Sequence, residues 1–511
     1  MMRRLSILFF AGLVSSACST DRPSSSAPLP LSAPLPPLAD VVSEPTEYAA
    51  QPPSAAAGEA FFSHYGVGDP YAAGVPYPVF LALRALYPEK LGRDWLEFSE
   101  RYGTIPNRDR PTDPDALPVG FHLATDPITR VDFLMINCHL CHADLIEASG
   151  KTVFVPGMGN RKLRLHAYDD ALVRIGQDDR LQMKDLLAAT GAAAKQHELA
   201  WPPDHRRPVV SETLRKMKHR AEVRGADSAR LAEALPGRVA TIEGFMLALN
   251  EQYDAGLELP ETIGWAKIPD VATWRYRETN SFDGVSNGAP VAMVAGADFA
   301  FGVRPQWYLE HQHIATSMFL YLRDFSRQLE YPGTIDATLA ATGEGLFSEH
   351  CAGCHGDYSG RYVGYEEQVV PLSVVQTDPA RVEAVTPEFA ETADGLEETR
   401  GLVVTHASDG YVPRPLVDLW ARGTYGHAGQ WPDLATLAVP PEERPERFVI
   451  DLGAPLDLER VGVAWSREGT AGGERHVYDA RVPGYGNGGH EFLSDLESEE
   501  RRAVLEYLKT L

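Results

Sequence analysis

The residues with the most specific chemistry in this sequence are its cysteines. The chain has 511 residues and five cysteines. Four of the cysteines lie in two C-x-x-C-H units, Cys138-His-Leu-Cys141-His142 and Cys351-Ala-Gly-Cys354-His355. Two thiols at this spacing on one turn can each form a thioether to a haem vinyl group, while the adjoining histidine reaches the iron from the same side. The spacing therefore predicts two covalently attached c-type haems, with His142 and His355 as iron ligands.

A zinc site and a thioredoxin-like redox pair are the alternatives for such cysteines. Zinc ribbons usually separate their cysteine pairs by roughly 15 to 20 residues, whereas 209 residues lie between Cys141 and Cys351. A redox pair would not require a histidine after both units. The fifth cysteine, Cys18, belongs to an N-terminal signal, so no cysteine remains for a disulfide framework.

The sixth ligand of the second iron is expected to be a histidine. All nine methionines lie at or before Met318, so none follows the second unit. His490 comes after a glycine-rich run that begins at Pro483, and glycines allow the backbone to approach a flat ring closely. We therefore predict His490 as the ligand, with His427 second. The other histidines considered in this part of the chain are His350, His406 and His476.

The first iron has several candidate sixth ligands, and the sequence does not choose among them. They are Met135, Met158, His166, His311 and His313. No catalytic residue can be assigned from the sequence.

The N-terminus has the layout of an export signal. Two arginines precede the apolar run Leu5–Val14, which is too short to span a bilayer, and small residues follow it. Residues 1–17 resemble a bacterial lipoprotein signal with Cys18 as the lipidated residue. Ordinary cleavage near Ala17 is the alternative, because Ser15 stands where such signals usually have Leu. Residues 18–58, rich in Pro, Ser and Ala, read as an extended tether.

Composition limits the partners of the protein. It is 44% hydrophobic and 23% charged, as in a folded globular chain, and its net charge of −24 disfavours nucleic acid as a partner. We expect a location in the periplasm or at the cell surface of a Gram-negative-type bacterium, with membrane contact only through a lipid on Cys18. The expected partners are an exported redox protein or a small oxidant such as peroxide or oxygen.

Several helices must position these residues. Periodicity predicts helices over 78–86, 91–102, 180–195 and 211–235. Another helix begins near Asp336 and runs into Cys351. A closing helix contains Val504 and Leu508, with Ser494 and Glu497 placed as a capping box.

The last two helices resemble those of small cytochrome c domains, in which an opening helix with Gly and Phe four apart leads into C-A-G-C-H-G and contacts the closing helix. The chain also resembles the di-haem family of bacterial cytochrome c peroxidases and the rubber oxygenase. The matching segments are 117–121, 155–158, 414–420, 425–429 and 483–491. Thr424 and Ala428 depart from the family pattern.

The resemblance implies a mainly α fold of two cytochrome c-like haem domains with long irregular loops. An enlarged N-terminal domain would span 59–335 and a second domain 336–511. The expected function is electron transfer. The alternative is a di-haem oxidoreductase, a peroxidase or rubber-oxygenase-like dioxygenase, with the N-terminal haem as reactive site. A small-ligand sensor is a third possibility.

Overall fold

The fold is described from a computed structural model. It describes residues 52–511 except 67, 280, 289–298, 300–301, 328, 360–361, 398–399 and 401–402. The predicted signal, Cys18 and most of the tether lie outside the described residues. Within the described part of the chain, no helix has both the length and the apolar character needed to cross a membrane.

The prediction of a mainly α fold is wrong. The described residues are 43% helix and 14% strand, with several small antiparallel sheets, and the fold is therefore mixed α/β. The strands are short, and most belong to two-stranded ladders. Their local sequence signal is correspondingly weak, because periodicity needs about four or more residues to show.

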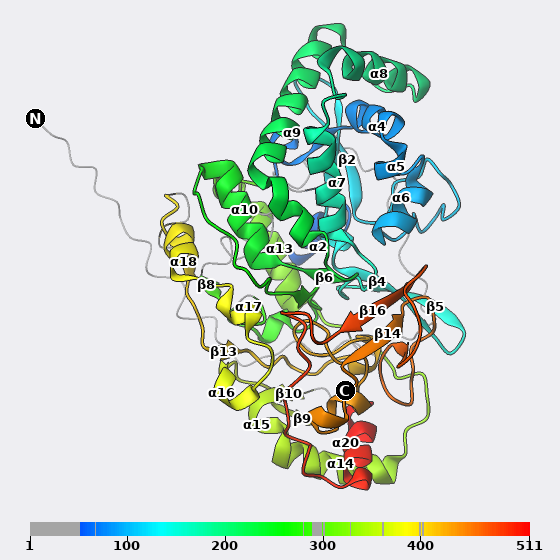
Figure 1. The fold of residues 1–511 in the computed structure, drawn as a ribbon, viewed down its shortest axis with the longest axis vertical. Helices are drawn as coiled ribbons and strands as arrows, with labels where there is room; N and C mark the ends of the chain where they lie inside the picture. The colour runs from blue at the N-terminus through cyan, green and yellow to red at the C-terminus, as the bar shows by residue number, and fades with distance from the viewer. Residues whose placement is uncertain are drawn as a thin grey trace, which may run out of the picture.

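One end of the molecule is a layer of packed helices (Figure 1). It contains α4 (Tyr77–Leu86), α6 (Trp95–Tyr102), α7 (Leu165–Gln177), α8 (Met183–Gln196) and α9 (Pro203–Leu231). Their apolar faces meet in one core, where the rings of Phe80 and Trp95 stack with centroids 5.1 Å apart. This layer lies over the strands that carry the first cysteine unit.

Two pairs of packed helices lie below this layer. Helix α2 (Ala55–Ser63) packs on α13 (Gln312–Asp324), and α14 (Ala337–His350) packs on α20 (Ser498–Leu508). The second pair is the predicted contact between the opening and closing helices, and it is confirmed. The remaining helices are α3 (Pro70–Ala73), α5 (Pro88–Leu91), α10 (Thr241–Tyr253), α12 (Pro305–Glu310), α15 (Ala352–His355), α16 (Leu372–Val375), α17 (Ala380–Glu383), α18 (Pro387–Asp394), α19 (Leu434–Leu437) and the 3-10 turns η1 (Cys138–Leu140), η2 (Trp274–Tyr276), η3 (Leu419–Ala421) and η4 (Pro441–Glu443).

In the described residues every sheet is antiparallel, and two of these sheets have three strands. These are β1 (Val75–Pro76), β3 (Asp132–Ile136) and β2 (Phe121–Thr125), and then β15 (Ala464–Ser466), β14 (Arg447–Asp451) and β16 (Arg475–Asp479). The two-stranded ladders are β4 (Ala143–Ala148) with β5 (Lys151–Pro156), β6 (Arg238–Val239) with β7 (Ala266–Lys267), β8 (Ser286–Gly288) with β12 (Val403–Thr405), β9 (Asp357–Ser359) with β10 (Tyr362–Gly364), and β11 (Val370–Pro371) with β13 (Gly410–Tyr411).

Several helix boundaries differ from the prediction for local reasons. The helix predicted over 91–102 is split, because Gly92 has a positive φ of 72° and Asp94 caps α6 by accepting from the backbone N–H groups of Leu96 and Glu97. The capping box of α20 is formed by Glu497 and Glu500, three residues after the predicted one.

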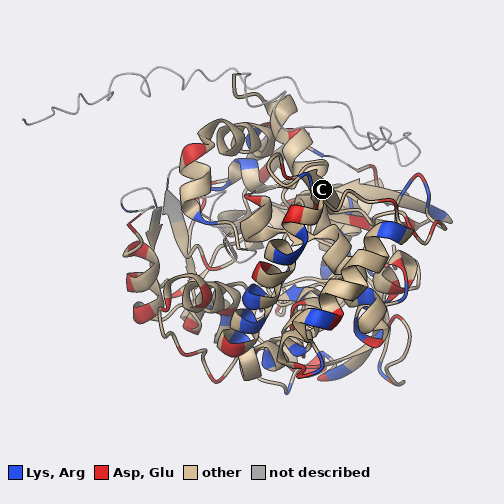
Figure 2. Cartoon of the chain, turned by 90° about the horizontal axis from the view of Figure 1, so that it is seen from above, with Lys and Arg blue, Asp and Glu red and all other residues tan. Residues whose placement is uncertain are grey.

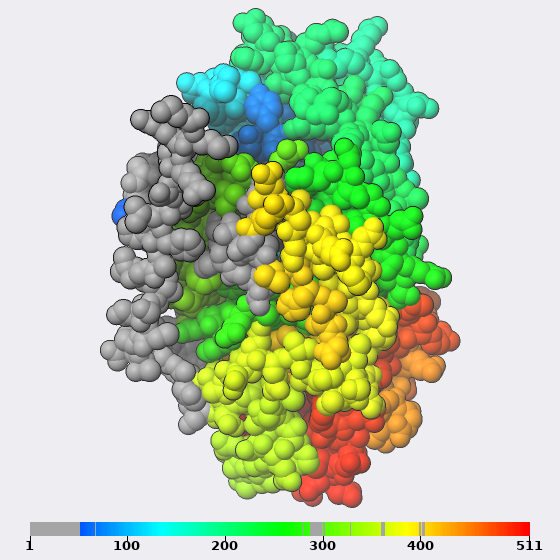
Figure 3. Space-filling view, turned by 90° about the vertical axis from the view of Figure 1, so that its left-hand side faces the viewer, coloured from blue at the N-terminus to red at the C-terminus, as the bar shows by residue number. Residues whose placement is uncertain are grey.

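The largest hydrophobic core includes residues from both sides of position 335. Met158 and Trp265 pack in the same cluster as Phe347, Trp420 and Tyr507. Helix α10 likewise packs in one cluster with α18 and with Ala384 and Val385 before it, and Figure 3 shows these green and yellow segments side by side. The two cysteine units are therefore held in a continuous body of protein.

Charged residues of both signs are spread along the chain. Figure 2 shows acidic and basic segments interspersed on neighbouring helices. The acidic residues that give the net charge of −24 are therefore not concentrated on a single one of these helices.

Candidate haem-attachment sites

The first cysteine unit forms a single helical turn. In η1 the side chain of Asn137 accepts the N–H of His139, and the N–H of His142 donates to the carbonyl of Cys138 at 2.8 Å. The ring Nδ1 of His142 donates to the carbonyl of Pro269 at 3.0 Å. Because a carbonyl can only accept, this bond leaves the Nε2 lone pair for a metal. Burial lowers the pKa of His142 to about 4, which keeps the ring neutral.

The second unit repeats this arrangement. In α15 the N–H of His355 donates to the carbonyl of Cys351 at 3.0 Å. Its ring Nδ1 donates to the carbonyl of Arg414 at 2.9 Å, and burial lowers its pKa. Gly356 ends the turn with a positive φ of 84°. Both histidines are thus oriented by a backbone carbonyl from a distant segment, as metal-binding histidines usually are.

The cysteine side chains lie in apolar surroundings, and none of the four forms a disulfide. Cys351 packs against the largest core, and burial raises the pKa of its thiol to about 12. Burial also raises the pKa of Cys354. Such thiols are poor thiolate nucleophiles or zinc ligands, whereas an uncharged thioether suits this environment. Among the residues that the structure describes, no three His, Cys, Asp or Glu side chains are grouped as metal ligands.

His490 faces His355 at a distance that suits one iron between them. Their ring centroids are 6.2 Å apart. Two metal–imidazole bonds of roughly 2.0–2.1 Å, with roughly 1 Å more from each nitrogen to its ring centre, add up to about 6 Å. The residues present therefore fit bis-histidine ligation by His355 and His490.

The loop of His490 holds the residue in an unusual conformation. Its φ is +52° and that of Gly489 is +69°, a region that residues other than glycine seldom adopt. Its N–H donates to the carbonyl of Val375 at 2.7 Å, and its ring lies 5.7 Å from that of Trp431 and 5.1 Å from that of Phe492. Burial, followed by repulsion from His355, lowers the pKa of His490 to about 3. Strain of this kind concentrates at functional sites.

His427, the second choice, is engaged elsewhere. Its ring stacks on Tyr411 with centroids 4.3 Å apart, and the Tyr411 hydroxyl lies 3.3 Å from His427 Nε2. Burial lowers its pKa to about 3. His476 lies in β16 with Nδ1 3.4 Å from an Arg164 nitrogen. His350 is the last residue of α14, and the N–H of His406 donates to Val285.

The first unit lines a large cavity. Its volume is about 1030 Å³, and His142, Cys138 and Cys141 form part of its wall together with many apolar side chains. Pockets for ligands in proteins measure about 300–1,000 Å³. The structure therefore provides space beside His142 for a large ligand.

Of the five candidate sixth ligands for the first iron, only His166 lines this cavity. Its Nε2 accepts the N–H of Ala240 at 2.8 Å, so that lone pair is already used. The other four candidates do not line the cavity. Met135 packs against Gly66 and Gly74, and Met158 lies in the largest core. His311 stacks on Trp307, and the Nε2 of His313 is buried without a hydrogen bond. Met318, which was not among the predicted candidates, lines the cavity.

The two helix pairs repeat the same contacts beside the two cysteine units. In α14 and α20, Gly343 lies against the backbone of Ala503, and Phe347 meets Tyr507 with ring centroids 5.2 Å apart. In α2 and α13, Gly58 lies against the backbone of Ser317, and Phe62 meets Tyr321 at 5.3 Å. The interplanar angle is 52° in both pairs.

This repeat is not apparent from the sequence alone. The opening helix of the first unit lies 75 residues before Cys138, whereas α14 leads directly into Cys351. The pair Gly58 and Phe62 has the same spacing as Gly343 and Phe347. This shared spacing is the sequence signal for the repeat, but two residues four apart are too common a pattern to identify it alone.

Comparisons with known proteins give two distant relatives. Both are from Sinorhizobium fredii (strain NBRC 101917 / NGR234). Uncharacterized protein y4iJ is 24% identical over 351 residues, which cover 51% of this chain and 58% of that protein. Uncharacterized protein y4iM is 26% identical over 221 residues, which cover 35% and 50%. The chain thus spans about half the length of these relatives, and their names state no activity. No family model matches the chain.

Proposed function

We propose that the protein is an exported di-haem c-type cytochrome that transfers electrons. The observation that carries this proposal is the repeat at the two C-x-x-C-H turns. Each turn carries two cysteines and a histidine whose Nδ1 donates to a backbone carbonyl. Each turn also lies beside a pair of helices that pack closely at a glycine, Gly58 or Gly343. A haem c bound at such a site supplies one-electron chemistry.

The residues of the second site favour an iron with no coordination position open to an external ligand. His355 and His490 would hold the metal from two sides, and Trp431 and Phe492 border the His490 ring. Histidine in place of methionine gives a lower reduction potential. A saturated haem of this kind suits electron relay.

The test is a count of covalent haem in variants. The wild-type protein is expected to retain two haems per chain after acid-acetone extraction, because thioethers do not extract. Replacing both cysteines of one unit, Cys138 and Cys141 or Cys351 and Cys354, with Ala should leave one haem. If the wild type retains no haem, the proposal is refuted. If it retains one haem per chain, then one of the two C-x-x-C-H units does not attach haem.

A second candidate function is favoured by the cavity beside His142. A di-haem oxidoreductase, either a peroxidase or a rubber-oxygenase-like dioxygenase, needs one iron accessible to a small oxidant. His142 lines a cavity of about 1030 Å³, whereas His355 faces His490. An attached haem would itself fill part of this cavity, so the support for the N-terminal haem as the reactive one is that the ring beside His142 is Phe62, which cannot bind iron, whereas the ring beside His355 is His490.

Carbon monoxide distinguishes the two functions. A relay with two saturated haems should show a reduced spectrum that carbon monoxide does not change. If the first iron is reactive, carbon monoxide should shift the Soret band of one haem, and the His490→Ala variant should then shift both.

A further inference from the structure

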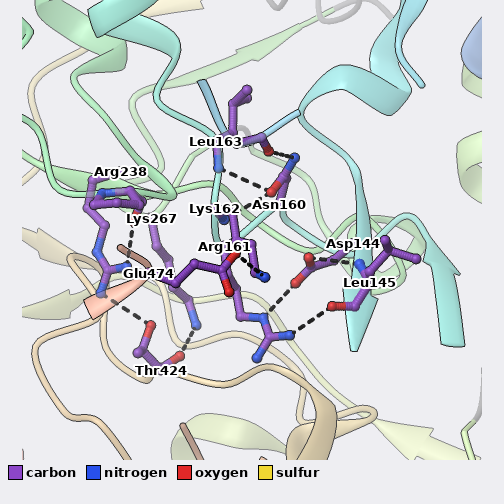
Figure 4. Close-up of polar contacts among 12 residues, drawn as sticks. Asp144, Leu145, Asn160, Arg161, Lys162, Leu163, Arg238, Lys267, Thr424 and Glu474 are labelled. Carbon is purple, nitrogen blue, oxygen red and sulfur yellow. Dashed lines mark hydrogen bonds and ion pairs between the residues drawn. The ribbon is translucent and has the colours of Figure 1, made fainter. Parts of the chain in front are cut away.

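A cluster of basic side chains lies inside the protein between the two haem-attachment sites. Five of them line a small cavity of about 30 Å³, namely Arg161, Arg238, Lys267, Arg414 and Arg422. Figure 4 shows Arg238 and Lys267 both reaching Thr424, whereas Arg161 bonds Asp144 and Leu145. The cavity has about the space of two water molecules.

The nearby carboxylates do not balance these charges. Arg161 pairs with Asp144 at 2.6 Å. Asp270, the carboxylate that lines the small cavity, pairs with a further cation, Arg327, which also bonds Asp418 at 2.8 Å. Six cations thus share three carboxylates, which leaves an excess of three positive charges.

The other four cations donate only to uncharged oxygen atoms in the described structure. Lys267 Nζ donates to the carbonyl of Thr424 at 2.5 Å. Arg238 donates to the carbonyls of Ala428 and Gly429, among others. Arg422 donates to the carbonyls of Val417 and Pro415. Arg414 donates weakly to the carbonyl of Asp270 at 3.5 Å, and its Nε is buried without a hydrogen bond.

An excess of buried positive charge is costly unless an anion compensates it. Charges inside proteins are normally paired, because a charge withdrawn from water without a partner is unfavourable. Burial, followed by repulsion from Arg422, lowers the pKa of Lys267 well below its usual value. The chain as a whole carries −24, so an interior excess of cations runs against its overall composition.

The cluster is also in contact with both haem sites. Lys267 and Arg414 line the large cavity that contains His142 and the two thiols of the first unit. The carbonyl of Arg414 accepts the hydrogen bond from the ring of His355. The carbonyl of Pro269, the residue before Asp270, accepts the hydrogen bond from the ring of His142. A ligand in the large cavity can therefore reach these two cations.

We propose that Lys267, Arg414 and Arg422 form a half-buried binding site for a carboxylate group. Two sources share this chemistry. One is the propionate side chain of a haem attached to this protein, which rests on the proposed function, and the other is a free carboxylate that enters the cavity.

The first arm of the test measures the midpoint potentials of the purified holoprotein between pH 5 and 8. With a haem propionate in the site, Lys267→Met should gain a pH-dependent step that the wild type lacks. The reason is that a carboxylate in a dry site with fewer cations takes up a proton at higher pH. Without a carboxylate, the variant should gain no step. Lys267→Arg keeps the charge and should behave as wild type.

Two further variants complete this arm. Lys162→Met removes a partly exposed lysine that pairs with Glu474 at 2.6 Å, and it should leave the potentials unchanged. Arg422→Gln removes a different cation of the cluster and should reproduce the Lys267→Met result. It replaces that variant if Lys267→Met does not fold.

The second arm titrates sodium acetate and follows the thermal midpoint of the same proteins. A free carboxylate site should give a saturable rise in wild type and Lys162→Met that Lys267→Met loses. If neither a new pH step nor this acetate effect is found, the proposed site is overturned. If the protein carries no covalent haem, the proposed function fails, and the acetate titration alone decides the site.

Discussion

His490 is the residue whose role can be tested most directly. Replacement with Ala should leave haem attachment intact, because Cys351, Cys354 and His355 remain, but convert one haem to a high-spin form. His490→Met should keep six ligands and raise the potential of that haem. Visible and electron paramagnetic resonance spectra measure the spin state, with His427→Ala as the matched control. A high-spin signal in the control and none in His490→Ala would contradict the assignment.

The sequence predicts His490 by elimination, and the structure shows how its loop brings the residue opposite His355. No methionine follows the second unit, and the glycines before His490 allow a positive φ at Gly489 and a close approach of the loop to Val375. The same approach could not select a ligand for the first iron. Spatial neighbours decide that question: Ala240 uses the Nε2 of His166, and Met318 reaches the cavity from a helix 176 residues after His142.

The crossing of α14 and α20 makes a prediction at the level of elements. A Cβ at Gly343 would collide with the carbonyl of Ala503, so Gly343→Ala should separate the helices and cost about 1–3 kcal/mol of unfolding free energy. Gly345→Ala is the control, because no atom lies within 4 Å of a Cβ there, and it should stabilise α14 by up to about 1 kcal/mol. Denaturant unfolding measures both. Equal effects of the two variants would show that the crossing is not tight.

Elements with a strong local pattern could be predicted, and those formed by distant partners could not. The helices α4, α8, α14 and α20 follow from apolar periodicity, and each lies within a few residues of its predicted range. The hairpin β4–β5 has a local signal in Ser149 and Gly150, which both have positive φ as a type I′ turn requires. Strands such as β8 and β12 pair across more than 100 residues, and no local pattern reports that.

The predicted location of the whole protein rests on a lipid attached to Cys18. If lipid on this residue is the anchor, Cys18→Ser should move the protein from the membrane fraction to the soluble exported fraction, because the lipid supplies the apolar attachment. Cell fractionation with immunodetection measures this, and Ser19→Ala serves as the control. Continued membrane association of Cys18→Ser would mean that another contact holds the protein.

Buried neutral histidines make the stability of the whole molecule depend on pH. Burial lowers the pKa of His166 to about 4 and that of His427 to about 3 in the folded state, against 6.5 for an ordinary histidine. Between pH 6.5 and about 4 the unfolded chain therefore binds more protons than the folded one, so stability falls as pH falls through this range. His166→Gln removes one such group and retains a side chain that can accept from Ala240. Its unfolding free energy near pH 5 should depend less steeply on pH than that of wild type, by about 1.4 kcal/mol per pH unit for one proton. Denaturant unfolding at pH 5, 6 and 7 measures the difference, and an unchanged slope would mean that His166 is protonated in the folded protein.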